Sequence, residues 1–327
     1  MHIRCPVGST LAFGAMLLGG GTVYGQAATL AQDYPNKTIR IICNAVGGGN
    51  DFIARQVAQG IAGPLGQPVI VDNKGGGTLL SAEAAFRATP DGYSLHVNGN
   101  ALLLVALMQA VPFDVLRDFS PISLISRNVN VLAVHPSVAA NSVKELIALA
   151  KARPGQLNYA STGPGGTSHI GGELFKSLAG VNVVRVVYKG GATATIGLVS
   201  GEVQMLIQDA GVMMPHAKNG KLRALAVTST TPSLMAPGLP TMAASGLPGY
   251  DWVGLTGIYA PAKTPAAIIT RLNREVVRAL NMPDVKERLL NTGEEIIGST
   301  PEQFLATIKE DMVRLGKLVR DAGIKSE

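Results

Sequence analysis

Short apolar runs, rich in β-branched residues, alternate along the chain with amphipathic stretches of roughly 10–15 residues. This alternation is typical of βα units on a mostly parallel sheet. The amphipathic stretches predict helices, and two of them begin with capping signals, Ser142 with Glu145 and Thr300 with Gln303. The apolar runs predict strands at residues 38–43, 68–72, 93–98, 129–134, 157–160, 183–188, 205–208, 222–228 and 254–259. The pattern therefore predicts an α/β fold.

Residues 131–136 and residues 257–261 share one order: a strand, a proline, and then a helix that begins after Ser142 or Thr264. A chain that leaves one lobe near the first segment and returns near the second would use these strands as a paired hinge, which fits closure around a ligand. Two ordinary βα units are the alternative. The length of 327 residues suits two lobes, since domains usually run to about 100–200 residues. We expect one lobe from residues 34–130 plus 256–327 and a second lobe from residues 131–255.

The first 27 residues predict a signal peptide. His2 and Arg4 give a basic start, residues 9–23 are apolar and free of acidic side chains, and small residues lead to a cleavage site after Ala27. The apolar stretch is short for a membrane span, which needs about 20 residues, and an uncleaved anchor is the alternative. Removal of residues 1–27 takes away Cys5, so the remaining Cys43 has no disulfide partner. The sequence therefore predicts a soluble, exported protein of the periplasm.

Composition and charge exclude several classes of function. The net charge of +6 comes from 28 Lys and Arg against 22 Asp and Glu, without a run of four basic residues, so a nucleic-acid partner is not expected. Aromatic residues make up 5%, with one Trp, which argues against a surface that stacks sugars or bases. The 5 histidines show no metal-ligand spacing. We therefore expect no metal, no cofactor and no nucleic acid.

Glycine-rich loops follow several predicted strands and lead into helices. They lie at residues 47–51, 75–78 and 161–169, and Tyr188 ends a further strand just before Gly190. Free backbone N–H groups at the start of a helix, where the helix dipole is positive, bind carboxylate or phosphate groups. Loops after successive strands of an open α/β sheet meet at one edge, where ligands bind. Because the nucleotide-binding spacings are absent, we predict a cleft for a small anion, with flexible connections as the alternative.

Four side chains in or near these loops have competing roles. Ser168 beside His169 could form a nucleophile pair, but the chain has no G-x-S-x-G elbow and no acidic partner is indicated, so a hydrolase is the minor alternative. If His169 is not part of such a pair, we expect it to form structural hydrogen bonds in its loop or to contact the ligand. Asp51 is expected to cap its helix. Asp209 is expected to pair with an ammonium group, to repel a further carboxylate, or to cap the next helix.

Several motifs occur together and in a fixed order. They are Tyr34-Pro35-x-Lys37-x-Ile39-Arg40, Gly47-Gly48 with Asp51, Pro90-Asp91-Gly92-Tyr93, Phe119-Ser120-Pro121-Ile122, Ser142-Val143-Lys144-Glu145-Leu146, Pro154-Gly155-x-Leu157-Asn158-Tyr159, Tyr188-Lys189-Gly190 and the run from Gly220 to Thr228. In this order the chain resembles the Bug-type, TctC-like extracytoplasmic solute receptors, which are the substrate-binding components of tripartite tricarboxylate transporters. The resemblance covers the chain from about residue 34 to Ile324.

This resemblance implies an α/β, two-lobed periplasmic binding protein fold, type II, with a two-stranded hinge. It implies a receptor, not an enzyme, for a small carboxylate such as a di- or tricarboxylate, an amino acid or an aromatic acid. Membrane permease subunits would be its partner, with a sensor of a signalling system as the alternative, and we expect a monomer. The ligand-binding residues that follow from the family are Gly47, Gly48, Asn50, Asp51, Gly76, Gly77, Thr78, Asn98 and Asn100 in the first lobe, and Ser161, Thr162, Gly165, Gly166, Thr167, His169, Tyr188 and Asp209 in the second.

Two loops depart from the family pattern. Asn44 and Val46 stand where the family often has proline, and the second loop lacks the proline that usually follows Asn73-Lys74. Both loops are also compact. Because these changes alter which N–H groups face the cleft, the identity of the carboxylate does not transfer from the family.

Overall fold

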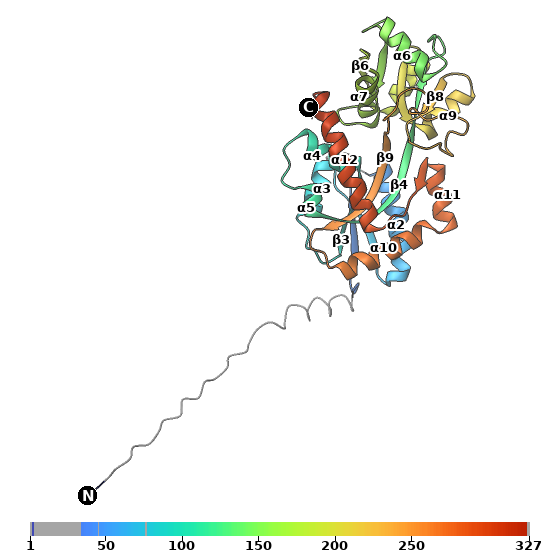
Figure 1. The fold of residues 1–327 in the computed structure, drawn as a ribbon. Helices are drawn as coiled ribbons and strands as arrows, with labels where there is room; N and C mark the ends of the chain where they lie inside the picture. Colours follow the sequence, from blue (N-terminus) through green and yellow to red (C-terminus); the bar gives the residue numbers. More distant parts are fainter. Residues whose placement is uncertain (1, 3–33, 45, 76, 326–327) are drawn as a thin grey trace. The chain divides into compact units, whose positions relative to one another are not determined.

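The structure is a computed structural model that describes residues 2, 34–44, 46–75 and 77–325. Apart from His2, the predicted signal peptide at residues 1–27 lies outside the described residues, and so does Gly76. Residues 35–327 form one unit, and the description below concerns this unit. Figure 1 shows its two lobes, which are joined by long strands.

In the first lobe, the buried apolar strand β1 lies between two parallel neighbours. Ile39 pairs with Val69 on β2, and Ile41 pairs with Leu95 on β3. Helices α2, α3 and α4 follow these three strands in turn, so their first turns gather at one edge of the sheet. The elements of this lobe are β1 (Ile39–Cys43), α2 (Gly49–Leu65), β2 (Val69–Asn73), α3 (Thr78–Phe86), β3 (Ser94–Gly99), α4 (Asn100–Met108), α5 (Val115–Asp118), α10 (Ala266–Leu280), α11 (Pro283–Asn291) and β10 (Glu294–Ile296).

The second lobe repeats this plan with a smaller sheet. β5 lies between β6 and β7 and is parallel to both. Helices α7, α8 and α9 follow β5, β6 and β7. The elements of this lobe are α6 (Val143–Ala152), β5 (Asn158–Ser161), α7 (Thr167–Ala179), β6 (Val184–Val187), α8 (Gly191–Val199), β7 (Met205–Asp209), α9 (Ala210–Lys218) and β8 (Arg223–Val227).

Two antiparallel strands, β4 (Phe119–Val134) and β9 (Val253–Pro261), form the hinge (Figure 1). They pair from Phe119 opposite Pro261 to Val129 opposite Val253. Beyond Val129, β4 pairs with β7 and β8 of the second lobe, whereas β9 pairs with β3 of the first. The predicted pairing of residues 131–136 with residues 257–261 is wrong, because residues 131–134 pair with β7 and β8 and residues 257–261 pair with the earlier part of β4. The predicted lobe boundaries fall inside these two strands and stay a prediction.

The prediction of a mostly parallel sheet is wrong. Among the described strands, the parallel pairs are β1–β2, β1–β3, β5–β6 and β5–β7, and every pair made by β4, β9 or β10 is antiparallel. The physical reason is the hinge: the chain crosses to the second lobe on β4 and returns on β9, so the two crossings run in opposite directions.

The helix starts follow the capping signals. Thr300 and Gln303 form the predicted capping box at the start of α12 (Pro301–Asp321), and this prediction is confirmed. At α6, Ser142 accepts a hydrogen bond from the Glu145 N–H, but Glu145 accepts from the Asn141 N–H instead of closing the box on Ser142. α12 packs against α4, α10 and β4 and reaches α7 of the second lobe (Figure 1). No helix in the described ranges has the length and apolar character that a membrane span needs.

Candidate functional site

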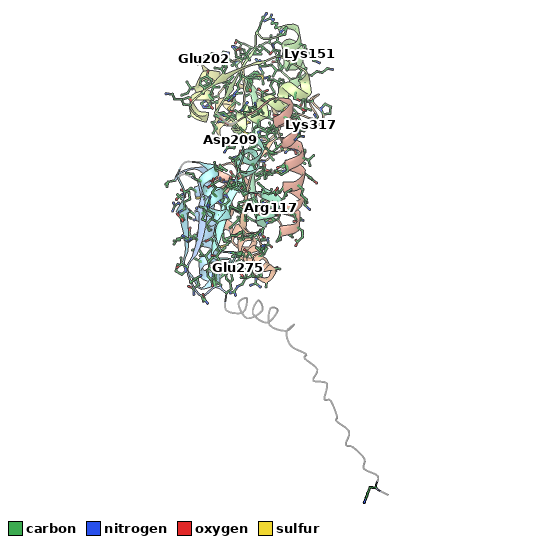
Figure 2. The ribbon with its side chains drawn as sticks, turned by 90° about the vertical axis from the view of Figure 1, so that its left-hand side faces the viewer. Arg117, Lys151, Glu202, Asp209, Glu275 and Lys317 are labelled. Carbon is green, nitrogen blue, oxygen red and sulfur yellow. The ribbon has the colours of Figure 1, made fainter. Side chains whose placement is uncertain are left out.

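A polar cleft of about 650 Å³ lies where the loops of both lobes meet the hinge. Figure 2 shows Asp209, one of its lining residues, at the level where the two lobes adjoin. Among the described residues that line it there is no Lys, Arg or His. The lining residues are Asn44, Gly48, Gly49, Asn50, Gly77, Thr78, Asn128, Asn130, Thr167, Gln208, Asp209, Val212, Gly254, Thr256 and Glu294.

Three helices begin at this cleft without a side-chain cap. Their N-cap residues are Gly48 for α2, Gly77 for α3 and Gly166 for α7, and none of these helices receives a side-chain cap hydrogen bond. The first N–H groups of a helix have no partner within the helix, and the helix dipole makes this end positive. The cleft therefore offers several backbone donors to an anion without placing a cationic side chain in it.

The same cleft carries two carboxylates, Asp209 and Glu294. Asp209 caps α9 by accepting from the Gly211 N–H at 2.7 Å, and it accepts from Nδ2 of Asn128 at 2.6 Å. Glu294 accepts from the Ser126 hydroxyl at 2.6 Å. Burial raises the pKa of Asp209, and burial together with the nearby Asp209 raises the pKa of Glu294. Each carboxylate is thus held in place by neutral donors.

Asn44 organises the wall of the cleft that belongs to the first lobe. Its Nδ2 donates to the Thr78 hydroxyl at 3.1 Å, and its Oδ1 accepts from Ser81 and from Asn98, each at 2.9 Å. Asn98 is fully buried and does not line the cleft, so it acts there through Asn44. Asn44, which the sequence marks only as a departure from the family pattern, is therefore central to this wall.

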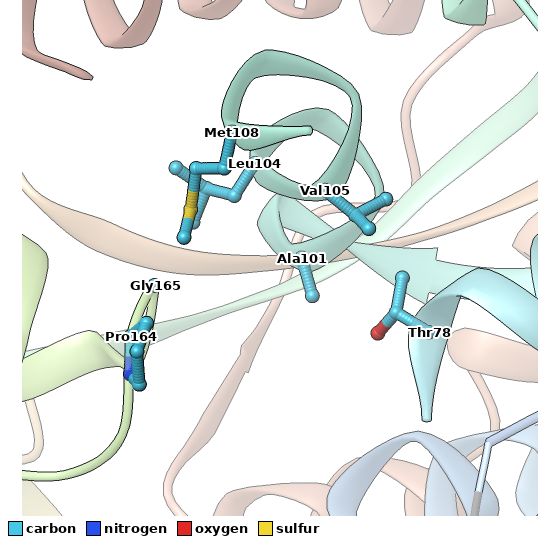
Figure 3. A pocket seen from close by; sticks show the side chains of 7 residues that line it. All are labelled: Thr78, Ala101, Leu104, Val105, Met108, Pro164 and Gly165. Atoms are coloured by element: carbon cyan, nitrogen blue, oxygen red, sulfur yellow. The ribbon is translucent and has the colours of Figure 1, made fainter. Parts of the chain in front are cut away.

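An apolar compartment of about 320 Å³ adjoins the polar cleft and shares Thr78 with it (Figure 3). α4 supplies most of its apolar surface, and Pro164 and Gly165 approach from the second lobe. A Cβ atom added to Gly165 would lie 3.1 Å from the Met108 sulfur, so the two lobes are close at this point. The remaining lining residues are Ala101, Leu104 and Val105.

Internal hydrogen bonds hold the loop between β5 and α7. The Thr162 N–H donates to the Ser168 hydroxyl at 2.9 Å, and the Gly165 N–H donates to Nδ1 of His169 at 3.2 Å. Arg185 on β6 donates to the Ser161 hydroxyl at 2.8 Å. Burial, with a smaller effect of the Arg185 charge, lowers the pKa of His169 to about 4, so its ring is a neutral acceptor at pH 7. Ser168 and His169 thus accept hydrogen bonds from different backbone N–H groups. Within residues 161–169, Thr167 is the residue that lines the polar cleft.

Asp51 holds the first glycine loop. It accepts from the Gly47 N–H at 2.9 Å and from Asn73 Nδ2 at 2.9 Å, and it forms an ion pair with Arg55. Burial alone would raise the pKa of Asp51, but hydrogen bonds from Arg55, Gly47 and Asn73 lower it below its ordinary value. The expectation that Asp51 is the cap residue is corrected: Gly48 is the N-cap of α2, and Asp51 lies within the first turn.

Asn100 and Tyr188 do not line the polar cleft. Asn100 accepts from the Leu255 N–H and donates to Asp311, so it joins α4 to the hinge and to α12. A Cβ atom added to Gly197 would lie 2.4 Å from the Tyr188 hydroxyl oxygen, which shows that the Tyr188 ring packs against α8 within the second lobe. Sequence spacing could not give these side-chain directions.

Of the family-derived residues, the structure brings six together on the polar cleft: Gly48, Asn50, Gly77, Thr78, Thr167 and Asp209. Gly165 lines the apolar compartment, and the other described ones support the loops behind the cleft or face elsewhere. Sequence reasoning did not predict Asn44, Asn128, Asn130, Gln208, Gly254, Thr256 or Glu294 as lining residues. For two of these residues the sequence does contain a signal: Asn128 and Asn130 are polar residues two positions apart beside an apolar run, a spacing that puts both on one face of a strand.

Comparisons with known proteins agree with this architecture. BugT of Bordetella pertussis is 33% identical over 307 residues, which cover 92% of this chain and 94% of BugT. A solved R. palustris protein with adipate is 30% identical with a TM-score of 0.74, covering 90% of this chain and 100% of that one. MatC from Rhodopseudomonas palustris, solved with bound malate, is 28% identical with a TM-score of 0.71, covering 88% of this chain and 100% of MatC.

A family model described as the tripartite tricarboxylate transporter family receptor matches residues 53–324. This match spans most of the chain, from within α2 to beyond α12, and includes the second lobe and the hinge. The chain therefore belongs to the tripartite tricarboxylate transporter receptor family.

Proposed function

We propose that this protein is a periplasmic solute-binding receptor that captures a small carboxylate in the polar cleft by closing its two lobes. The observation that carries the proposal is the meeting of three uncapped helix starts, those of α2, α3 and α7, at one cleft between lobes joined by a two-stranded hinge. The carboxylates named for the related proteins, adipate and malate, support this ligand class. A ligand that touches both lobes stabilises the closed state.

The proposal includes export with removal of residues 1–27, a monomeric state, and delivery of the ligand to membrane permease subunits. It assigns no catalysis to the chain. The geometry of Ser168 and His169 supports this, because their acceptor atoms are engaged by the N–H groups of Thr162 and Gly165. A ligand is therefore expected to leave the protein chemically unchanged.

A thermal-shift experiment tests the proposal. The chain without residues 1–27 is unfolded and refolded to remove bound metabolites and is then heated with mono-, di- and tricarboxylates, amino acids, aromatic acids and phosphate. A ligand at about 100 times its Kd adds about 2.7 kcal/mol of stability. We expect a selective rise in melting temperature with a carboxylate that is recovered intact. A folded sample that responds to none of these compounds, or that converts one of them, would contradict the proposal.

A matched pair of variants locates the site. Gly48→Val places a branched side chain at the uncapped start of α2 in the cleft, and we expect the affinity to fall more than about tenfold. Gly190→Val is the control, since Gly190 is the extended, uncapped N-cap of α8 and a Cβ there meets no atom within 4 Å. Equal affinities for the two variants would remove the start of α2 from the site.

A further inference from the structure

We propose that the ligand of this cleft is a zwitterion, a carboxylate that also carries a protonated amine, and that the amine binds at Asp209 and Glu294. This inference rests on the proposed function and names the substrate class of the same site. It starts from the charge of the lining: within the described chain, the cleft has two carboxylates and no cationic side chain.

The two carboxylates have neutral partners only. Asn128 lies between them, donating to Asp209 at 2.6 Å and to Glu294 at 3.5 Å. No described Lys, Arg or His forms an ion pair with either one. Two like charges in one partly buried site repel each other, and a cation placed between them removes this cost. An ammonium group supplies that cation together with several N–H donors.

The polar lining also holds a donor without a partner. Asn130 is 1% exposed, and its Nδ2 has no hydrogen-bond partner in the described structure. It lies two residues after Asn128 on β4, so both side chains lie on the same face of the strand, and its Cα is paired with that of Asp209. A buried donor without an acceptor is unfavourable, and a carboxylate of the ligand provides the acceptor.

A ligand with both groups satisfies all of these features at once. Its carboxylate accepts from the N–H groups at the starts of α2, α3 and α7 and from Asn130, and its amine donates to Asp209 and Glu294. A second carboxylate in place of the amine would meet like charges at close range. Dicarboxylates of the same length are therefore expected to bind more weakly than amino carboxylates.

Calorimetric titration of the refolded, metabolite-free protein with a set of probes on one carbon skeleton tests this inference. The probes are pentanoate, glutarate, 5-aminopentanoate and 2-aminopentanoate. We expect at least one amino carboxylate to bind about tenfold or more tightly than glutarate and pentanoate. Glutarate binding as tightly as both amino carboxylates would overturn the inference and leave the proposed function standing. A folded sample that binds none of the four would also overturn the inference, whereas only a failure with the wider set of the thermal-shift experiment would overturn the proposed function.

The double variant Asp209→Asn, Glu294→Gln assigns the preference to these residues. Asn still caps α9, and Gln still accepts from the Ser126 hydroxyl, so the fold is retained. The ratio of amino carboxylate to glutarate affinity is expected to fall about tenfold. The control, Asp284→Asn with Glu302→Gln, removes the same two charges from α11 and α12 outside the cleft and keeps the wild-type ratio. A ratio that does not change in the cleft variant would overturn the assignment.

Discussion

Gly99 at the end of β3 lies directly against the carbonyl oxygen of Leu255 on β9: a Cβ atom at residue 99 would be 1.6 Å from that oxygen. The neighbouring Asn100 side chain accepts from the Leu255 N–H, so both backbone polar groups of Leu255 lie against the turn from β3 into α4. This close approach joins the first lobe to the hinge. Only a residue without a side chain fits at position 99.

The first prediction follows from this contact. Gly99→Ala is expected to lower the free energy of unfolding by about 3 kcal/mol or more, because the obstructing atom belongs to the backbone and a strand must move. Urea denaturation measures the change. Gly190→Ala is the control, since both glycines are N-caps and a Cβ at Gly190 meets no atom within 4 Å. A similarly small decrease in the free energy of unfolding for both variants would show that the close approach of Gly99 to Leu255 is not a fixed part of the fold.

The sequence predicted the βα order well because this order depends on local signals. Apolar runs, glycine loops and helix caps each arise within about ten neighbouring residues. The capping box of Thr300 and Gln303 and the glycine N-caps at the cleft are read from such neighbours. The resemblance to the family then gave the fold class with its two-stranded hinge, but not which residues of the two strands pair.

The remaining part of the cleft depends on contacts between distant segments. The predicted strand at residues 129–134 is only the end of β4, since Ser123, Ser126 and Asn128 interrupt the apolar pattern further upstream. Those polar residues find partners far along the chain: Ser123 donates to the Ser299 carbonyl, and Ser126 donates to Glu294. Glu294 reaches the cleft because the short strand β10 pairs with β4, which no local pattern indicates.

A second prediction concerns the contact between the lobes at the apolar compartment. Gly165 has a φ of +72°, and a Cβ there would crowd the Met108 sulfur at 3.1 Å. Gly165→Ala is expected to lose about 1 kcal/mol of stability from backbone strain and also to weaken ligand binding, because the lobes could not close as far. Gly220→Ala is the matched control, with a φ of +69° and no atom within 4 Å of the added Cβ. Titration calorimetry should show weaker binding for Gly165→Ala alone, and unchanged affinity in that variant would contradict the prediction.

A third prediction concerns the thiol of Cys43, which is fully buried. Burial, with a further contribution from the Asp51 charge, raises the pKa of this thiol to about 11. Since the thiolate is the reactive form, a chromogenic disulfide reagent at pH 8 should modify the native chain without residues 1–27 very slowly. The same reagent should react promptly after unfolding in guanidinium chloride. Rapid modification of the native protein would show that the end of β1 opens to solvent.

A fourth prediction concerns the acid sensitivity that His96 gives to the fold. The ring is fully buried, donates from Nδ1 to the Ile42 carbonyl oxygen, and lies near Phe119 and Tyr259. Burial lowers the pKa of His96 from 6.5 to about 4. Between these values the unfolded chain binds a proton that the folded chain does not, so the free energy of unfolding falls as the pH falls. At its limit this contribution is roughly 3 kcal/mol.

His96→Phe keeps a buried ring and removes the titrating group, so its stability should fall less than that of the wild type between pH 7 and about 4.5. The variant has to be compared with the wild type because other groups also change the stability at acidic pH. Burial raises the pKa values of Asp209 and Glu294, so these two groups make the free energy of unfolding rise as the pH falls. Leu95→Ala on the same strand is the control: it destabilises the core at every pH but keeps the wild-type slope. Urea melts at several pH values measure the slopes, and parallel curves for His96→Phe and the wild type would assign the acid sensitivity to other groups.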